Sequence, residues 1–185
     1  MNLSTKYSDQ PRAYTGVELR PHFILSELKV QGPALVAFVG SCRVETEHLV
    51  DWEDRLVNDR IEAAQMVHFL GEFFGMGLRE GVFAQRLLMA IMGEVLREKG
   101  IDVRRSGDDL FIQNRKLSVS IVTASPVSVL LHAGINIDPA GAPVPAIGLG
   151  EIGIDPVEWT QAVLAKFLEE YSSVDWACAK VRPVI

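Results

Sequence analysis

Cysteine is scarce in this sequence, and no stretch is apolar for long enough to resemble a membrane span. The two cysteines, Cys42 and Cys178, lie far apart and outside any CxxC spacing, which excludes a thiolate zinc cage and argues against a disulfide scaffold. No apolar run reaches the roughly 18 residues that predict a membrane helix. An N-terminal apolar run with a basic flank, typical of a secretory signal, is also missing. We therefore expect a cytoplasmic protein without membrane contact.

Positively charged residues are also fewer than negatively charged ones. Lys and Arg number 18 against 24 Asp and Glu, for a net charge of -6, whereas nonspecific nucleic-acid binding needs a cationic surface. A nucleic-acid partner is therefore not expected. The 185 residues, 48% hydrophobic and 23% charged, are typical of a globular domain. Because neither repeats nor a linker are visible, we expect one domain over residues 1–185, with a polar and loosely held segment at 1–15.

The pattern along the chain predicts an α+β domain with a mixed, largely antiparallel sheet packed against helices. Apolar stretches bounded by glycine and proline predict strands, over residues 16–24, 32–40 and 66–74, with a short edge strand at 176–185. Apolar positions at helical spacing predict helices, over residues 46–58, 79–99 and from 156 onward. Asp155, Pro156 and Glu158 mark the start of the last helix, because they suit its cap, first position and third position.

Residues 108–137, "DDLFIQNRKLSVSIVTASPVSVLLHAGINI", predict two strands joined near Ser125 and Pro126. Because side chains alternate along a strand, each strand carries an apolar face and a polar face. The polar positions are Lys116, Ser118 and Ser120 in the first strand and Ser128, His132, Gly134 and Asn136 in the second. Serine and glycine leave room beside the lysine and the histidine. This pattern favours a ligand-binding face over its alternative, a face covered by water or by a partner.

Three residues are candidates for chemistry. Lys116 suits contact with an anion or a carbonyl group, or it is a turn lysine in water. His132 is a candidate general base, or a hydrogen-bonded core histidine. His68 precedes Glu72 by four residues, which suits a base oriented by a carboxylate, or a structural pair on a half-buried strand.

Two acidic stretches have both a functional and a structural interpretation. Asp108 and Asp109 suit ligand contact, directly or through Mg²⁺, or they form a turn before a strand. His48, Asp51 and Asp54 include the residue types of a metal-dependent hydrolase, and they equally suit the acidic outer face of a helix. We assign no metal site from the sequence.

The stretch "DDLFIQNRKLSVSI", followed by "HAGINI", resembles the central signature of the biotin and lipoate protein ligases. In those enzymes an Asn-Asp pair opens a strand, a short turn leads to a lysine, and a Gly-Ile-Asn-like segment follows the next strand. The chain is also similar to an uncharacterised prokaryotic family of unknown function, through "RPHFI", "VDWED", "MVHFLGEFF" and "HAGINI". The resemblance implies the ligase fold, which is related to class II tRNA synthetases.

The same resemblance implies roles for residues of the signature. Lys116 matches the lysine that contacts the acyl-adenylate, Asp109 matches the aspartate of the pair, and Asp108 replaces its asparagine. Further ligand contacts would come from Ser118, Ser120, Gly134 and Asn136. His132 or His68 would move a proton. The chain is then a small-molecule-binding protein with acyltransferase or ligase-like activity.

The sequence departs from the ligases where they bind phosphate. They carry an Arg- and Gly-rich segment before the strand that corresponds to 66–74, whereas "NDRIEAAQ" contains Arg60 and no glycine. A Walker-type loop is also missing. Acyl transfer from a preactivated donor, as in the octanoyl transferases of that fold, therefore fits better than ATP-driven ligation, and the cofactor is left open. The alternatives are a non-catalytic metabolite-binding or regulatory module and the metal-dependent hydrolase. We also expect a homodimer through an exposed sheet edge.

Overall fold

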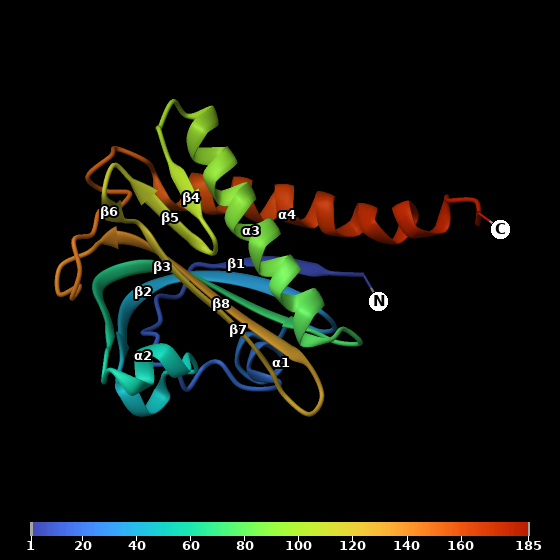
Figure 1. The fold of residues 1–185 in the computed structure, drawn as a ribbon, viewed down its shortest axis with the longest axis horizontal. Coiled ribbons are helices and arrows are strands. Elements are labelled where there is room, and N and C mark those ends of the chain that lie inside the picture. The colour runs from blue at the N-terminus through green and yellow to red at the C-terminus, as the bar shows by residue number, and fades with distance from the viewer. Residues whose placement is uncertain (1, 185) are drawn as a thin grey trace.

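A five-stranded sheet forms the centre of the computed structural model (Figure 1). Its strands, in spatial order, are β1 (Ser4–Ser8), β2 (Ala34–Val44), β3 (Ile61–Phe73), β8 (Val129–Asp138) and β7 (Ser118–Ala124). β1 runs parallel to β2, and all other neighbours are antiparallel. The predicted mixed, largely antiparallel α+β class is therefore confirmed. The structure describes residues 2–184; Met1, in the segment expected to be loose, and Ile185, in the expected terminal strand, lie outside them.

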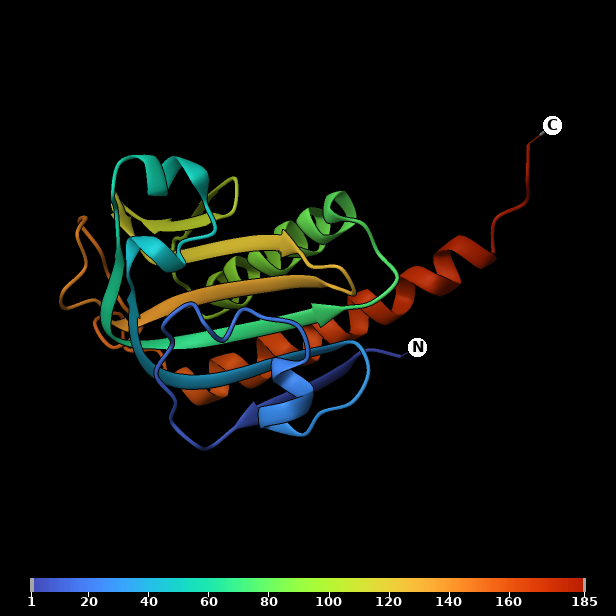
Figure 2. The same cartoon turned by 90° about the horizontal axis from the view of Figure 1, so that it is seen from below.

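Two long helices, α3 (Leu78–Glu98) and α4 (Pro156–Ala179), cover one face of the sheet (Figure 2). Their apolar stripes pack on that face, where Trp159 meets Phe69 edge to face at 6.0 Å between ring centroids. The predicted start of α4 is confirmed, because the Asp155 carboxylate accepts a 2.7 Å hydrogen bond from the Glu158 amide. The edge strand expected at 176–185 is wrong, since α4 continues to Ala179. None of the described helices combines the length and the apolar character that a membrane crossing requires.

A second, three-stranded sheet lies beside the end of β7. It consists of β4 (Arg104–Ser106), β5 (Asp109–Ile112) and β6 (Arg115–Lys116). The Leu110 amide of β5 donates to the Ser118 hydroxyl at 2.8 Å, and the Leu117 amide donates to the Leu110 carbonyl at 2.8 Å. The strand expected over 116–121 is therefore divided, with Lys116 in the small sheet and residues 118–124 in the large one.

The opposite face of the large sheet is covered by short helices and irregular segments (Figure 2). The strand predicted at 16–24 is wrong: His22 adopts a left-handed backbone with φ 61°, and α1 (Phe23–Leu28) starts directly after it. The buried Phe23, Ile24 and Leu28 lie on one side of this helix and contact the sheet. The helix predicted at 46–58 is shorter than expected, because a 3-10 turn (Thr46–His48) precedes α2 (Trp52–Leu56).

The N-terminal segment is held firmly, which corrects the expectation for residues 1–15. β1 pairs with β2, and Tyr14 is only 3% exposed. The Tyr14 amide donates to the Ser41 carbonyl at 2.9 Å, and the Arg43 amide donates to the Tyr14 carbonyl at 3.0 Å. Gly40 permits this close approach, since a Cβ there would lie 1.8 Å from the Arg12 carbonyl oxygen. The segment thus packs Tyr14 against the face of the sheet opposite to α3 and α4.

The register between β7 and β8 corrects the predicted polar face. Ser120 lies opposite Ala133, and the Ser120 hydroxyl accepts a 2.8 Å hydrogen bond from Gln85 of α3. The next residue, Ile121, lies opposite His132. Because directly paired residues of antiparallel strands share a face, the serines of β7 lie on the helix side and His132 lies on the other. The four-residue connection between Ala124 and Val129 sets this register, and a shift of one residue would reverse every side chain.

Candidate functional site

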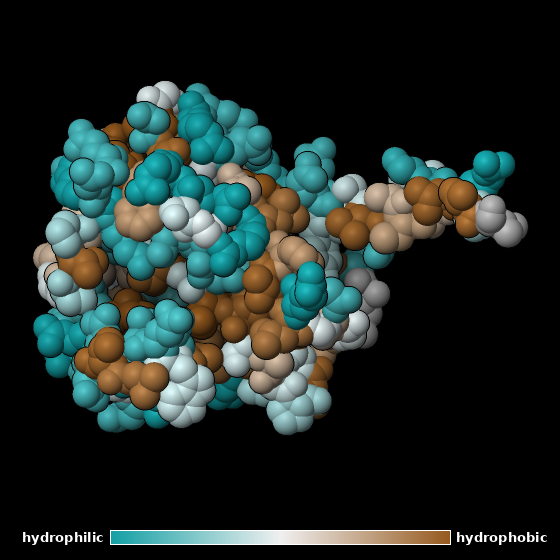
Figure 3. Space-filling model, viewed as in Figure 1, coloured by the Kyte–Doolittle hydropathy of each residue, from teal (hydrophilic) through white to brown (hydrophobic). Residues whose placement is uncertain are grey.

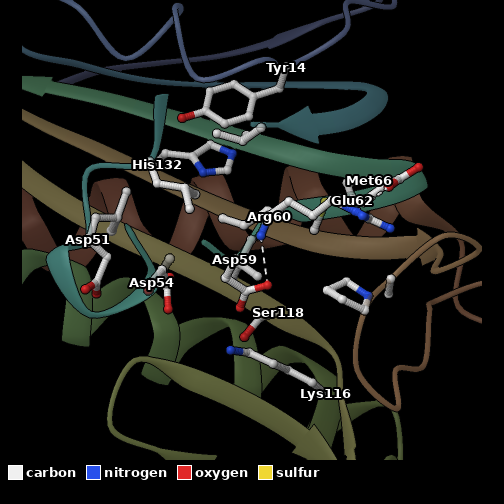
Figure 4. Close-up of a pocket in the computed structure, with 18 of the residues that line it drawn as sticks. Tyr14, Asp51, Asp54, Asp59, Arg60, Glu62, Met66, Lys116, Ser118 and His132 are labelled. Carbon is white, nitrogen blue, oxygen red and sulfur yellow. Dashed lines mark hydrogen bonds and ion pairs between the residues drawn. The ribbon is translucent and has the colours of Figure 1, made fainter. Parts of the chain in front are cut away.

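A cavity of about 280 Å³ lies on the side of the sheet that α3 and α4 leave uncovered (Figure 4). Its walls come from the N-terminal segment around Tyr14, the end of β2 and the segment after it, the starts of β3 and β7, the short strands β5 and β6, β8, and the loop 142–146. Lys116, His132, Asp108, Asp109 and Asn136 all contribute side chains to it. The fold therefore brings together residues that the sequence singled out in several different segments.

Two buried histidines form a chain that ends at this cavity. The His68 and His132 rings are bonded through His68 Nδ1 and His132 Nε2 at 3.1 Å, and His68 Nε2 lies 3.3 Å from the Gly40 carbonyl oxygen. A carbonyl oxygen can only accept. His68 Nε2 therefore carries a hydrogen, His68 Nδ1 accepts, and His132 Nε2 donates to it. His132 is left with a lone pair on Nδ1, an assignment that follows from the hydrogen-bond network.

Burial keeps both rings neutral. Removal from water lowers the pKa of His68 to about 4. Hydrogen bonds to the backbone at Gly40 and Ser41 raise this pKa, but by less than burial lowers it. Burial, followed by the neighbouring His68, lowers the pKa of His132 well below its ordinary value. Tyr14 stacks on His132 with 3.7 Å between ring centroids and 7° between planes, which fixes the imidazole. His132 lines the cavity, and His68 supports it from behind.

The predicted pairing of His68 with Glu72 is wrong. Four residues along a strand span about 13 Å, so side chains on the same face at that spacing do not meet. The Glu72 carboxylate instead accepts from the His22 amide at 2.9 Å and from the Ser128 hydroxyl at 2.8 Å. Glu72 therefore ties α1 and the β7–β8 connection to the sheet, and the partner of His68 is His132.

Lys116 stands in the cavity wall as an ion pair. Its Nζ lies 3.0 Å from Asp109 Oδ2, and both side chains are about one third exposed, at 32% and 28%. Burial raises the pKa of Asp109, while the charge of Lys116 and its hydrogen bond oppose that rise. The Lys116 amide donates to the Pro145 carbonyl at 2.9 Å, which fixes the backbone beside the loop 142–146. The Lys116 ammonium group thus borders the cavity, and the Asp109 carboxylate largely neutralises its charge.

Asp108 and Ser120 join the small sheet to α3 and border the cavity. The Asp108 carboxylate accepts from Gln85 Nε2 at 3.1 Å and lies 3.3 Å from Arg86 Nη2. The Ser120 hydroxyl donates to the Asp108 carbonyl oxygen at 3.0 Å. These contacts show a structural task for both residues at the edge of the site.

Ser118, Asn136 and Gly134 also have structural tasks. The Ser118 hydroxyl accepts from β5, as described above, and Asn136 Nδ2 donates to the carbonyl oxygens of Lys116 and Ile147 at 3.3 and 3.2 Å. Gly134 does not line the cavity. A Cβ at Gly134 would lie 2.8 Å from the Met66 methyl carbon, so the glycine makes room for that side chain.

Three aspartates, Asp51, Asp54 and Asp59, form the acidic wall of the cavity (Figure 4). Burial and then the charges of Asp51 and Asp59 raise the pKa of Asp54. Asp51 also caps α2, accepting from the Glu53 amide at 2.7 Å. Over residues 2–184, no three His, Cys, Asp or Glu side chains are grouped so that they could hold a metal ion. His48, Asp51 and Asp54 therefore give no support to the metal-dependent hydrolase.

Sequence reasoning did not identify Tyr14 and Met66 as residues of the site. Tyr14 belongs to a segment whose polar composition predicts no fixed structure, and only its pairing with β2 places it over His132. Met66 had no signal beyond that of a core residue. Cys42 is 1% exposed, and burial raises the pKa of its thiol to about 12, so its role is packing in the core.

The overall fold is similar to that of solved biotin and lipoate protein ligases. A putative lipoate protein ligase from T. acidophilum has a TM-score of 0.60 with 14% identity, over 91% of this chain and 85% of that one. The biotin protein ligase from Aquifex aeolicus, in complex with biotin and ATP, has a TM-score of 0.57 with 20% identity, over 93% and 71%. The chain therefore has a biotin/lipoate ligase-like fold, and the predicted fold resemblance is confirmed.

The family is defined more narrowly. The model of a domain of unknown function, DUF366, matches residues 3–182, and the chain belongs to this family. An uncharacterised protein of Methanocaldococcus jannaschii is 31% identical over 179 residues, which cover 93% of this chain and 81% of the relative. A protein of unknown function from Pyrococcus horikoshi has a TM-score of 0.94 with 36% identity over the whole of both chains.

Proposed function

We propose that the cavity binds a small acyl or acyl-adenylate-like molecule and that the protein transfers its acyl group to a nucleophile of a second substrate, with the activating group of the donor, such as AMP, leaving. One observation carries this proposal: Lys116 and the free Nδ1 of His132 line the same cavity, in a fold that is similar to the biotin and lipoate protein ligases. An acyl transfer needs a positive charge where negative charge develops and a group that accepts a proton. These two side chains supply both kinds of group in one place.

Each residue then has a distinct task. Lys116 Nζ contacts the acyl carbonyl or the neighbouring phosphate, within reach of Asp109, its present partner. His132 Nδ1 accepts a hydrogen from the ligand, and His68 positions the imidazole through the 3.1 Å bond on the other side of the ring. We therefore classify Lys116 and His132 as candidate catalytic residues and His68 as a positioning residue.

The charges of the cavity favour a preactivated acyl donor over ATP. Among the described residues its Lys and Arg side chains are Lys116 and Arg60, and each is paired, with Asp109 at 3.0 Å and with Glu62 at 3.0 Å. A triphosphate needs several cationic or backbone donors that are not already engaged. A donor with one negative charge, such as an acyl-adenylate, needs fewer free cationic or backbone donors than a triphosphate does.

The second candidate is a metabolite-binding module without catalysis. It is favoured by burial of the two histidines, which lowers the pKa of both well below the ordinary value, because such a base takes up protons poorly near neutral pH. In that case His132 serves only as a hydrogen-bond acceptor for the ligand. Turnover of an acyl donor separates the two candidates.

Thermal unfolding with a panel of ligands tests the proposal. The panel is a non-hydrolysable acyl-adenylate analogue, ATP, AMP, biotin, lipoate and octanoate, with wild type, Lys116→Ala and, as a matched control, Lys99→Ala. Lys99 forms its ion pair with Glu158 on the far, helical side. A ligand at 100 times its Kd adds about 2.7 kcal/mol to the free energy of unfolding.

We expect the analogue to raise the Tm of wild type and of Lys99→Ala. In Lys116→Ala the rise in Tm should be much smaller. No shift with any ligand rejects the acyl-adenylate site. An equal shift in all three proteins rejects the role of Lys116. Binding followed by release of the acyl group from a cleavable donor identifies an acyltransferase, and binding without release identifies the module.

A further inference from the structure

Three carboxylates of the cavity have no cation within ion-pair distance among residues 2–184, although the charge of Lys116 partly offsets that of Asp54. Lys116 is paired with Asp109 and Arg60 with Glu62, while Asp108 lies 3.3 Å from Arg86. His48, which also borders the cavity, lies 3.9 Å from Glu47. After these pairs are formed, Asp51, Asp54 and Asp59 have no cationic partner among residues 2–184.

His132 is a second, independent observation at the same place. It is 2% exposed, its Nε2 is engaged with His68, and no side chain or backbone group of residues 2–184 bonds to its Nδ1. The hydrogen-bond network leaves a lone pair on that atom. Among residues 2–184, Trp159 Nε1 is the fully buried side-chain nitrogen or oxygen that lacks a hydrogen-bond partner, so His132 Nδ1 must reach the open space of the cavity, where a donor from outside can bond to it.

Asp51 and Asp59 each accept one backbone hydrogen bond, from the amides of Glu53 and Arg60 at 2.7 and 2.8 Å, and each keeps further acceptor capacity. Together with Asp54 and His132 Nδ1, these groups accept hydrogen bonds or attract positive charge. Figure 4 shows Asp51, Asp54 and His132 around the same hollow, with Lys116 on its lower side. A metal ion is a poor match, because the acidic residues are not grouped as ligands of one ion. An organic ammonium or guanidinium group matches better, since its several N–H donors can reach acceptors that lie apart.

We infer that the cavity selects a small cationic amine, whose ammonium or guanidinium group lies against Asp51, Asp54 and Asp59 and whose further N–H or O–H donor meets His132 Nδ1. The inference rests on the proposed function only in taking this cavity as the ligand site. In an acyltransferase the acyl acceptor is the further N–H or O–H group: it gives its proton to His132 Nδ1 and takes the acyl group as the donor's phosphate leaves, while the cationic end anchors the molecule; in a binding module the amine is the ligand itself. The cavity volume of about 280 Å³ suits a small metabolite, and the net charge of -6 attracts cations from solution.

Titration calorimetry with matched probes tests this inference. The cationic probes are 1,4-diaminobutane and agmatine, the neutral probe of similar length is 1,4-butanediol, and the anionic probe is succinate, all at equal ionic strength. The variant is Asp54→Asn, since this side chain neither caps a helix nor forms an ion pair, and removing its charge relieves repulsion in the free protein. Asp175→Asn, on the exposed part of α4, is the control with the same change in net charge.

We expect wild type and Asp175→Asn to bind a cationic probe and neither butanediol nor succinate. Asp54→Asn should bind it about tenfold more weakly or worse, the loss that follows when a hydrogen bond to a charged group is removed. Binding of butanediol with similar affinity, an unchanged affinity in Asp54→Asn, or no binding of either cationic probe overturns the inference.

The acyl-adenylate analogue distinguishes this failure from failure of the proposed function. If the analogue binds and the amines do not, the acyl site stands and the amine inference is wrong. If the amines bind and the analogue does not, the acyl-transfer proposal is wrong and the cavity is an amine-binding site. Binding of neither rejects both.

Discussion

His132 shows how much one buried side chain contributes to this site. Its Nε2 is bonded to His68 at 3.1 Å, its ring is stacked against Tyr14, and no group of residues 2–184 bonds to its Nδ1. The neutral state of the pair comes from burial, so that the same environment that orients the imidazole also lowers its basicity.

We predict that acid destabilises the protein through His68. The unfolded chain binds a proton there with the ordinary pKa of 6.5, whereas the folded chain does so at about 4. Between these values the unfolded state binds more protons, so the free energy of unfolding falls as the pH falls from about 6.5 to about 4. The contribution of this group is about 3 kcal/mol, at 1.36 kcal/mol per pKa unit.

Urea denaturation between pH 4 and pH 7.5 checks this prediction. His68→Gln keeps a donor for the Gly40 carbonyl and an acceptor for His132 but does not titrate, so its stability should depend less on pH than that of wild type. His22→Gln, at an exposed position, serves as the control. The same pH dependence in wild type and His68→Gln would contradict a titrating role for His68.

At the scale of elements, the position of the N-terminal segment determines whether the site is complete. Residues 12–14 lie against a bulge in β2, where the register shifts between Gly40 and Cys42. Only a residue without a Cβ fits beside the Arg12 carbonyl. The segment in turn holds Tyr14 on His132, so that a local backbone feature of β2 controls a side chain of the cavity.

We predict that Gly40→Ala displaces this segment. The added methyl group cannot share the space of the Arg12 carbonyl, and we expect a loss of about 1–3 kcal/mol in the free energy of unfolding, the usual cost of overpacking. Hydrogen exchange should become faster at residues 12–15, because the amides of Arg12 and Tyr14 lose their bonds to β2. Gly77→Ala is the control, since its φ is -86° and its nearest neighbour is the flexible end of Glu80 at 3.3 Å. Unchanged exchange in Gly40→Ala would contradict the displacement.

At the scale of the whole molecule, the second half of α4 extends away from the body and carries exposed apolar side chains (Figure 3). Trp176 is 68% and Val174 50% exposed. The large sheet ends at β1 and β7. The homodimer expected from the sequence through an exposed sheet edge stays a prediction. Sedimentation velocity of the full chain should then give a species of twice the 20.4 kDa chain mass, and a monomer at all concentrations would reject it.

Several elements could be predicted from local patterns. The helix α3 follows from apolar positions three and four residues apart, and the start of α4 from the cap at Asp155, because both signals act within a few residues. β2 and β3 follow from apolar runs between glycines. The strand expected at 16–24 failed because a left-handed residue at His22 starts a short helix that is stabilised mainly by packing on the sheet.

The sequence by itself determined the class of the fold, its two long helices and the candidates Lys116, His132 and Asp109, through periodicity, capping residues and a signature that resembles the ligases. The tertiary structure alone decided which of them meet. The β7–β8 register placed Ser118 and Ser120 on the helix side, the close approach at Gly40 brought Tyr14 to His132, and the pairing of charges left Asp51, Asp54 and Asp59 without an ion-pair partner among residues 2–184. These outcomes depend on contacts between distant segments, whose energies no local pattern records.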